Sequence, residues 1–281
     1  MIKEKNSNIH SGSPFRGTGG FLLHLADNTL MLAQRNSEWT GHGPVLEQDI
    51  AITNIALDLI GQSRNLYAHA ATVYNAANEP AQKEWESHLP KIWKTYNREL
   101  QEDDLAMLRE ERQYLNLLIT ELPRGDWAFT TLRQFFFSTF QQLQYTALLS
   151  HEDETLRAIA EKSLKEVAYH IRWSAEWVIR LGDGTDESAA RLNTALQNLL
   201  PYVGEFFLPA PYEAIDPGAF KTPWLQKVNT VFEQAQLKPL TTTQLEAKGI
   251  SGGKAGKHTE HLGYLLTELQ YMQRTYPNSV W

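Results

Sequence analysis

Two short segments carry an acid or an imidazole at a spacing that suits iron chemistry. They are Asp58-Leu-Ile-Gly61 and Val167-Ala-Tyr-His170. Residues three apart lie on one face of a helix, so two Glu-x-x-His pairs and two further carboxylates can hold a di-iron centre inside a four-helix bundle. Gly61 stands where an imidazole is needed, and Val167 stands where an acid is needed. We therefore interpret Asp58, Gly61, Val167 and His170 as degenerate ligand positions that bind no metal.

A third segment weakens the metal site further. Between Trp127 and His151 the chain has no Asp or Glu, so a helix there supplies no bridging carboxylate. Glu166 lies four residues before His170, but a helix turns it about 100° away from the ligand position. Because oxygen-activating iron needs anionic oxygen ligands, we expect a four-helix framework without metal. Asp58 is then expected to be a buried acid satisfied by an arginine or a hydroxyl, and His170 a hydrogen-bonded histidine of the core or of a cleft.

The composition limits the kinds of protein that this chain can be. It has 281 residues, of which 42% are hydrophobic and 21% charged, as in ordered globular proteins. Its 33 acidic and 26 basic side chains give a net charge of −7, the wrong sign for binding along a nucleic-acid backbone. The absence of cysteine excludes disulfides, thiolate nucleophiles and cysteine metal sites. With no apolar run long enough for a bilayer and no hydrophobic signal at the start, we expect a cytoplasmic protein without membrane contact.

The candidate residues are positioned by helices, and no alternating strand pattern occurs. Apolar periodicity predicts an amphipathic helix over residues 20–37, a centrally buried helix over 44–75, two long helices within 126–181, a short helix over 187–200 and a final helix over 258–276.

The remaining segments are expected to be less regular. They are a flexible tail over residues 1–18, short helices between 80 and 121 with an exposed face over 102–119, and mostly loop over 201–239, which holds six of the 12 prolines. The predicted fold is all-α: a ferritin-like four-helix bundle core with additional helices and a Pro-rich loop region, in a single domain over residues 19–281.

Six stretches of the chain are similar to one protein family. They are Leu25-Ala-Asp-Asn28, Glu38-Trp-Thr-Gly-His-Gly-Pro44, Ile50-Ala-Ile-Thr-Asn-Ile-Ala-Leu-Asp-Leu-Ile-Gly-Gln-Ser-Arg64, Glu102-Asp-Asp-Leu-Ala106, Lys165-Glu-Val-Ala-Tyr-His170 and Gly252-Gly-Lys-Ala-Gly-Lys-His-Thr-Glu-His-Leu-Gly263. In this order they resemble the C subunits of bacterial phenylacetyl-CoA epoxidases, also called ring-hydroxylating phenylacetyl-CoA monooxygenases. The similarity runs from about residue 22 to the C-terminus, and residues 78–100 depart from it.

The resemblance implies a chain without a cofactor of its own, paired with a catalytic A subunit that holds the di-iron centre. In such complexes a flavin and iron–sulfur reductase passes electrons from NADPH to the A subunit, which epoxidises the aromatic ring of phenylacetyl-CoA. The C-like chain is expected to be a structural subunit that helps shape the acyl-CoA site at or near the interface. An obligate interface of about 2,000 Å² or more suits the eight tryptophans. Two of these, Trp85 and Trp93, can equally be core positions.

A glycine- and lysine-rich segment over residues 252–258 precedes the last predicted helix. Lys254, Lys257 and the free amides of a helix start can bind a phosphate, and coenzyme A carries three. The segment is not a P-loop, because His258 replaces Ser or Thr and no strand precedes it. Contact with the partner chain explains the segment equally well. His258 and His261 lie three residues apart, but no nearby acid completes a metal site with them.

Two other functions fit parts of the sequence. A catalytic di-iron carboxylate oxygenase or an iron-binding ferritin-like protein would need an unrecognised ligand set, such as Asp27, Asp58, Glu166 and His170. A stand-alone acyl-CoA-binding protein would have to bind CoA at micromolar concentration as an isolated chain.

Overall fold

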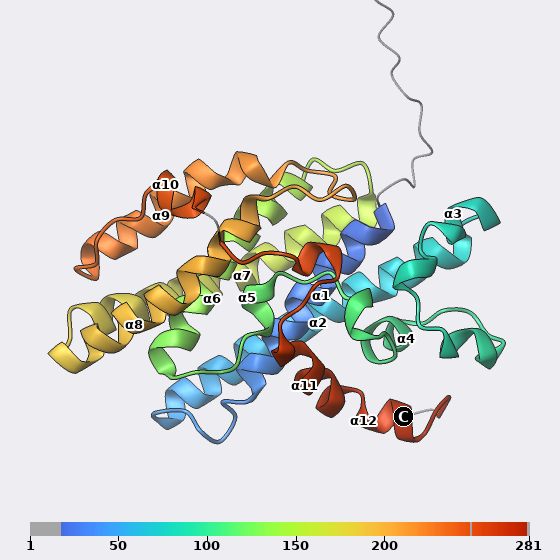
Figure 1. Ribbon diagram of the computed structural model, residues 1–281, viewed down its shortest axis with the longest axis horizontal. Helices are drawn as coiled ribbons and strands as arrows, with labels where there is room; N and C mark the ends of the chain where they lie inside the picture. The colour runs from blue at the N-terminus through green and yellow to red at the C-terminus, as the bar shows by residue number, and fades with distance from the viewer. Residues whose placement is uncertain (1–17, 248, 280–281) are drawn as a thin grey trace, which may run out of the picture.

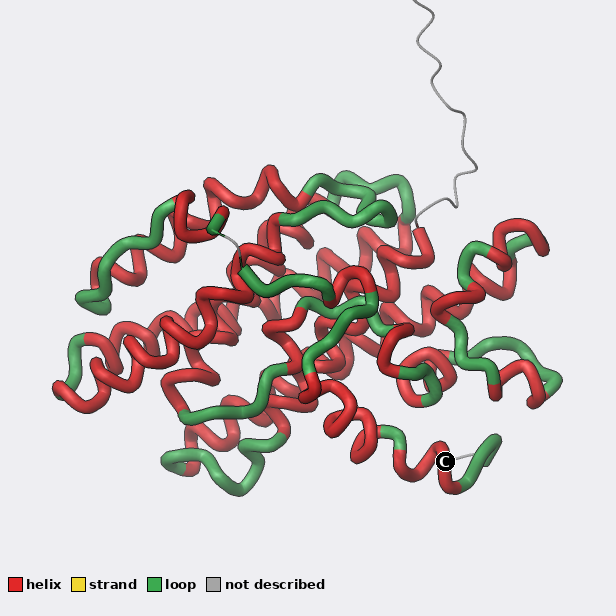
Figure 2. Tube along the Cα trace, viewed as in Figure 1, coloured by secondary structure: helices red, strands yellow, loops and turns green. Residues whose placement is uncertain are grey.

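The computed structural model describes residues 18–247 and 249–279, and within these ranges every regular element is a helix (Figure 1; Figure 2). Four long helices form the core: α1 (Thr18–Ser37), α2 (Leu46–Ala76), α6 (Trp127–Leu148) and α7 (Glu154–Gly182). Helix α1 packs against α2, α6 packs against α7, and α2 also contacts α7. The predicted all-α fold with a four-helix core is confirmed.

Shorter elements surround this core, with α8, α9 and α10 at the opposite end of the molecule from α3 and α4 (Figure 1). The α-helices are α3 (Glu79–Lys83), α4 (Glu102–Met107), α5 (Leu118–Glu121), α8 (Asp186–Val203), α9 (Lys221–Gln234), α10 (Thr242–Glu246), α11 (Glu260–Leu269) and α12 (Tyr271–Thr275). The 3₁₀ turns are Glu86–His88, Ile92–Tyr96, Glu111–Gln113, Gly204–Phe207, Pro217–Phe220 and Gly253–Ala255.

The boundaries of α6 and α7 follow from local sequence. The side chain of Asp126 accepts a hydrogen bond from the backbone N–H of Phe129 at 2.9 Å, and Asp153 accepts one from Leu156 at 3.0 Å. Each helix therefore begins at an acidic N-cap, which satisfies a backbone donor that has no partner within the helix. The prediction of two long helices within residues 126–181 is confirmed.

The burial of α1 and α2 differs from the prediction. Helix α1 is buried on nearly all sides, with Asp27 at 0% and Arg35 at 8% exposure, so the predicted amphipathic character is wrong. Helix α2 is not centrally buried as predicted, because it exposes Leu46, Ile50 and Leu57 along one face. The cause is a layer of chain over the outer side of α1, whereas no part of the described chain covers the outer face of α2.

The layer over α1 is a segment that we call the strap, residues 114–122. All nine of its residues are buried, and its only regular part is the four-residue helix α5. The exposed face predicted for residues 102–119 is found only in part. Asp103 and residues 110–112 are exposed, but α4 ends at Met107 and residues 114–119 are buried. A buried segment that is mostly not helical cannot satisfy its own backbone groups, so other parts of the protein must bind them.

The proline-rich region, residues 201–239, is more regular than predicted. It contains the 14-residue helix α9 and two 3₁₀ turns, so the expectation of mostly loop is wrong. Pro217 and Pro223 lie in the first turns of their elements, where a helix does not use the backbone N–H that proline lacks. The predicted final helix is also divided, because α11 and α12 meet at Gln270.

Trp85 and Trp93 both pack against Tyr74. Their ring centroids lie 5.8 Å and 5.6 Å from that of Tyr74, in edge-to-face geometry. Trp85 is only 4% exposed. Of the two roles left open by the sequence, Trp85 takes the core role, and the partly buried Trp93 packs against the edge of the same core.

Two further predictions concern membrane contact and the N-terminal tail. No helix within the described ranges is long and apolar enough to cross a membrane. The predicted tail, residues 1–18, lies outside the described residues except for Thr18, at which α1 begins.

Candidate functional site

Asp58 on α2 and His170 on α7 meet across the seam between the two helices. Nε2 of His170 lies 3.0 Å from Oδ2 of Asp58. The imidazole is fully buried, whereas the carboxylate is 36% exposed. His170 is thus a hydrogen-bonded histidine, as expected. The partner of Asp58 is this histidine and not an arginine or a hydroxyl, and the acid lies at the edge of the bundle.

Gly61 does not occupy an inward ligand position. It is exposed, and a Cβ added to it would meet no heavy atom within 4 Å. The interpretation of Gly61 as the place of a lost inward imidazole is therefore wrong. Its neighbour Gln62 is the inward residue, 2% exposed, because one step along a helix changes direction by about 100°.

A hydrogen-bonded network of neutral side chains, which we call the bundle centre, is formed by Gln62, Gln141 and Tyr145. Glu166 and the Asp58–His170 pair lie beside it. Nε2 of Gln62 donates to Glu166 at 2.8 Å, and Nε2 of Gln141 donates to Oε1 of Gln62 at 3.0 Å and lies 3.2 Å from the Tyr145 hydroxyl. Burial raises the pKa of Tyr145, so its phenol stays protonated. These donors bind Oε2 of Glu166 and Oε1 of Gln62, whereas Oε1 of Gln141 and Nδ1 of His170 are buried without a hydrogen-bond partner among the described residues.

The residues present do not fit a di-iron centre. Among the described residues no three His, Asp or Glu side chains come together to hold a metal ion. Leu59 and Val167, both 0% exposed, provide hydrocarbon on the inner faces of α2 and α7. The alternative ligand set is also separated, because Asp27 is bound elsewhere and Glu166 accepts a hydrogen bond from Gln62.

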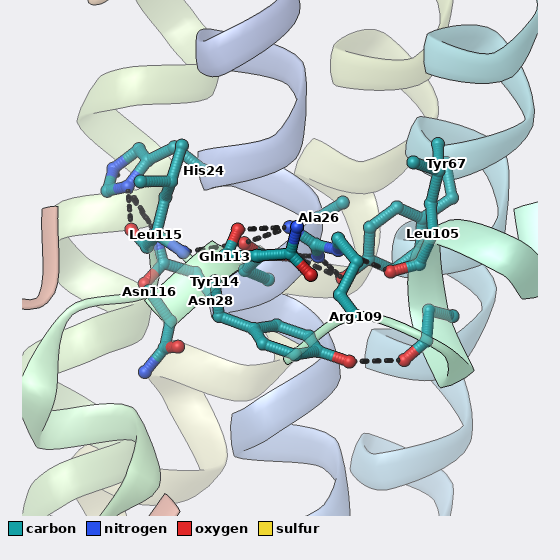
Figure 3. Close-up of polar contacts among 12 residues, drawn as sticks. His24, Ala26, Asn28, Tyr67, Leu105, Arg109, Gln113, Tyr114, Leu115 and Asn116 are labelled. Carbon is teal, nitrogen blue, oxygen red and sulfur yellow. Dashed lines mark hydrogen bonds and ion pairs between the residues drawn. The ribbon is translucent and has the colours of Figure 1, made fainter. Parts of the chain in front are cut away.

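Asp27 forms a buried ion pair with Arg109, and Figure 3 shows the contacts around the guanidinium. Both side chains are fully buried, and the Tyr67 hydroxyl also donates to Asp27. The second carboxylate oxygen accepts a hydrogen bond from the backbone N–H of Leu115 at 2.7 Å. Arg109 in turn donates to the carbonyl of Gln113 at 2.8 Å. This charged pair therefore satisfies backbone groups of the strap and of the chain just before it.

Two other polar residues of α1 bind the strap (Figure 3). Nδ1 of His24 lies 2.7 Å from the carbonyl oxygen of Leu115, and Oδ1 of Asn28 accepts from the N–H of Leu117 at 2.7 Å. Burial, together with the charge of Lys254, lowers the pKa of His24 to about 3. His24 is therefore neutral, and its Nδ1–H donates to the carbonyl while Nε2 accepts from Asn28 at 3.2 Å.

The glycine- and lysine-rich segment binds groups of its own chain. The N–H groups of Gly252 and Gly253 donate to Oε1 of Glu205 at 2.7 Å and 2.8 Å. The ammonium of Lys254 is buried, and it donates to Glu213 at 2.9 Å and to the carbonyl of Leu208 at 2.7 Å. Burial lowers the pKa of Lys254, and the carboxylates of Glu213 and Glu205 oppose that shift.

The other two candidates of this segment differ in their surroundings. Both ring nitrogens of His258 are bound, Nδ1 to Glu121 at 2.8 Å and Nε2 to the carbonyl of Tyr114 at 2.9 Å. Burial lowers the pKa of His258, but the hydrogen bond and charge of Glu121 raise it to a value above the usual one. His261 contributes its backbone carbonyl, which accepts from Arg35 at 3.1 Å. Lys257 is exposed, so the two lysines do not face one common phosphate position.

Sequence reasoning did not single out four charged residues with buried side chains, of which Glu121 lies in the strap and Glu205 accepts from the backbone N–H of Leu118 within it. They are Arg109, Glu121, Glu205 and Glu213. The available signal was a lone charge within an apolar run, as in Leu118-Ile-Thr-Glu121-Leu122 and Glu205-Phe-Phe-Leu208. Such charges are seldom buried unless they are paired.

The fold and the bundle centre together define a class: a ferritin-like helical protein with a hydrogen-bonded amide network inside its bundle. A family model described as phenylacetic acid catabolic protein matches residues 16–281, and the chain belongs to this family. It is also 37% identical over 269 residues to the C subunit of the 1,2-phenylacetyl-CoA epoxidase of Escherichia coli (strain K12), a match that covers 93% of this chain and 98% of that protein. The resemblance found in the sequence is thereby confirmed.

Proposed function

We propose that this chain is the non-catalytic C-type subunit of a phenylacetyl-CoA epoxidase in aerobic phenylacetate degradation. The observation that carries the proposal is the bundle centre, where Gln62, Gln141 and Tyr145 hydrogen-bond one another and hydrocarbon lines the inner faces. A chain that binds no iron there needs a partner for oxygen chemistry. The similarity to a named C subunit supports the same conclusion.

In this proposal the partner is a catalytic A-type subunit with the di-iron centre, in a heterodimer or a larger hetero-oligomer. A reductase component supplies its electrons, and other subunits complete the complex. The C-type chain contributes a rigid helical body that holds the A-type subunit in its working shape and borders the phenylacetyl-CoA site at or near the interface. No residue of this chain takes part in a bond-making step.

Co-expression with the A-type subunit from the same organism tests the proposal. We expect the two chains to elute together from a size-exclusion column, with iron in the complex and less than about 0.1 iron per chain in this protein alone. Epoxidation of phenylacetyl-CoA should need both chains and the reductase. Separate elution would contradict the proposal, and about two irons in the isolated chain would establish the di-iron alternative.

The CoA contact of the glycine- and lysine-rich segment stays a prediction, which rests on the exposed Lys257. Replacement of Lys257 by Ala should weaken the affinity of the assembled complex for phenylacetyl-CoA without changing the stability of this chain. Replacement of Lys254 by Ala should instead lower stability, because Glu213 loses its buried partner. Unchanged affinity of the Lys257→Ala complex would remove the phosphate role. Micromolar CoA binding by the isolated chain would favour the stand-alone acyl-CoA-binding alternative.

A further inference from the structure

The outer face of α2 is apolar over half of a long helix. Leu46 is 72% exposed, Ile50 51% and Leu57 59%, and the helix is 31 residues long. Residues 46, 50, 57 and 61 follow a helical period, so these three side chains and Gly61 form one stripe, which the exposed Asn54 interrupts between Ile50 and Leu57. Single exposed leucines are ordinary, but three large exposed apolar side chains in line on a long helix mark a contact surface.

Gly61 leaves the C-terminal end of the stripe without a side chain. It is exposed, and no heavy atom lies within 4 Å of the position where a Cβ would be. Glycine within a helix costs about 1 kcal/mol relative to alanine, so its place in the middle of α2 calls for a gain elsewhere. Close approach of another helix is such a gain, since small residues let helix backbones pack closely.

The neighbouring face of α7 continues this surface and adds positive charge. Helices α2 and α7 are joined by the Asp58–His170 and Gln62–Glu166 contacts, so their outer faces lie side by side. On the exposed side of α7 three cations lack a carboxylate partner within the described chain, namely Lys162, Lys165 and Arg172, against one such acid, Glu161. This basic margin belongs to a chain with a net charge of −7.

The two-helix surface is large enough for the central part of a stable interface. The stripe spans residues 46–61 of α2, about 24 Å at 1.5 Å per residue. Together with the α7 surface beside it, the stripe offers roughly 500 Å², compared with about 800 Å² per partner in an interface of standard size. An apolar stripe with a charged margin is also the usual anatomy of such an interface.

We propose that the α2–α7 face, defined by Leu46, Ile50, Leu57 and Gly61 of α2 with Lys165, Tyr169 and Arg172 of α7, binds the A-type subunit. The occupant is a helix of that subunit with an apolar ridge and Asp or Glu side chains along the edge that meets Lys165 and Arg172. The inference rests on the proposed function and assigns its partner surface. It also accounts for α2 being apolar on two faces, because one face packs in the core and the other packs against the partner.

Matched variants of this chain test the assignment. The double variant Ile50→Arg/Leu57→Arg places two charges on the stripe, and Tyr264→Arg/Tyr271→Arg is the control, since these tyrosines on α11 and α12 are 74% and 63% exposed. Each is co-expressed with the A-type subunit, and the dissociation constant of the complex is measured by biolayer interferometry. We expect the stripe variant to weaken binding on the order of 100-fold and the control to bind like the wild type. Circular dichroism of the isolated variants verifies that both are folded.

A charge-reversal variant keeps the test decisive if the stripe variant fails to fold. Lys165→Glu/Arg172→Glu changes only exposed side chains, and it should weaken binding about tenfold, mostly through slower association at low salt. If the wild-type form of this chain does not bind the A-type subunit, the proposed function fails. If it does, and the stripe and charge variants bind normally or the control is equally impaired, the surface assignment fails. Loss of a homodimer of this chain with normal A-type binding would assign the face to a second copy and overturn the proposal.

Discussion

Two buried regions of this protein contain different kinds of polar side chain: neutral amides in the bundle centre and charged groups around the strap. The bundle centre, between regular helices, holds the neutral amides Gln62 and Gln141, with Glu166 at its margin. The strap, residues 114–122, is surrounded by buried charges such as Asp27 and Arg109. In other ferritin-like proteins carboxylates gather in the bundle to bind metal. Here they gather around the strap.

The difference follows from backbone hydrogen bonding. Helices satisfy their own N–H and C=O groups, so the bundle centre needs no charge unless it binds an ion. The strap has little helix, and water cannot reach it. Its backbone donors are therefore met by Asp27, Asn28 and Glu205, at 2.7 Å to 2.8 Å. The buried carboxylates of Asp27 and Glu205 thus bind backbone groups of the chain.

The largest effect should come from breaking the charged pair under the strap. Replacement of Arg109 by Met leaves the Asp27 carboxylate buried without its counter-ion, so the free energy of unfolding should fall by about 3–5 kcal/mol. Urea denaturation of the wild type and the variant measures this. The control is Arg64→Met, at a side chain that is 75% exposed, which should change stability by less than about 1 kcal/mol. A loss at position 109 no larger than that of the control would contradict the comparison.

Low pH should reduce the stability of the protein, because it favours protonation of His24, which binds the strap. Its pKa is about 3 in the folded protein and 6.5 when unfolded, so its stabilising contribution is complete above pH 6.5 and is lost as the pH falls toward 3. The loss at pH 5 should be about 2 kcal/mol. The stability difference between wild type and His24→Asn should therefore shrink by that amount from pH 7 to pH 5 in denaturation experiments. If the free energy of unfolding changed equally with pH in the wild type and in His24→Asn, this prediction would be contradicted. The control is the exposed His42→Asn variant, whose stability should change with pH as that of the wild type does.

The bundle centre should tolerate loss of an amide. In Gln141→Leu the Gln62 oxygen loses one donor and keeps the Tyr145 hydroxyl nearby, so we expect a loss of only about 1 kcal/mol. Thermal or urea unfolding provides the measurement. A loss above about 3 kcal/mol would show that this network holds the fold as strongly as the charges around the strap.

The smallest effect should be a gain in stability, caused by replacing Gly61 with alanine. Alanine there adds a methyl group in open space within a helix, so stability of the isolated chain should rise by about 0.5–1 kcal/mol. The matched control is Gly253→Ala under the strap, where the added Cβ would lie 2.0 Å from the carbonyl oxygen of Asn116 and should destabilise the chain. Destabilisation by Gly61→Ala would mean that this position faces protein.

Much of the fold can be predicted where one local signal dominates. The long helices α6 and α7 lack internal breaks and follow the N-cap residues Asp126 and Asp153, so their limits follow from the sequence. Helix α9 is not predicted because Pro223 resembles a loop signal, although proline is compatible with a first helical turn. The strap is not predicted either, because a buried segment with little helix and lone charges has no period to detect.

The candidate site is predictable in its residues but not in the direction that each one faces. The sequence singles out Asp58 and His170, and in the structure Nε2 of His170 lies 3.0 Å from Oδ2 of Asp58. The sequence cannot tell that Gly61 faces outward, because α2 carries apolar residues on two faces, with Ile52, Ile55 and Leu59 inside and Leu46, Ile50 and Leu57 outside. Periodicity gives the spacing of a stripe and not what the stripe packs against.

The sequence by itself determined the helical class, the four long helices and the family, since these depend on local periodicity, caps and ordered matches along the chain. Only the tertiary structure decided which helix is enclosed, where the buried charges lie and which face of α2 is left open. Those features depend on contacts between segments far apart in sequence, such as Arg109 with Asp27 and Glu205 with Gly252, and no local pattern encodes such pairs.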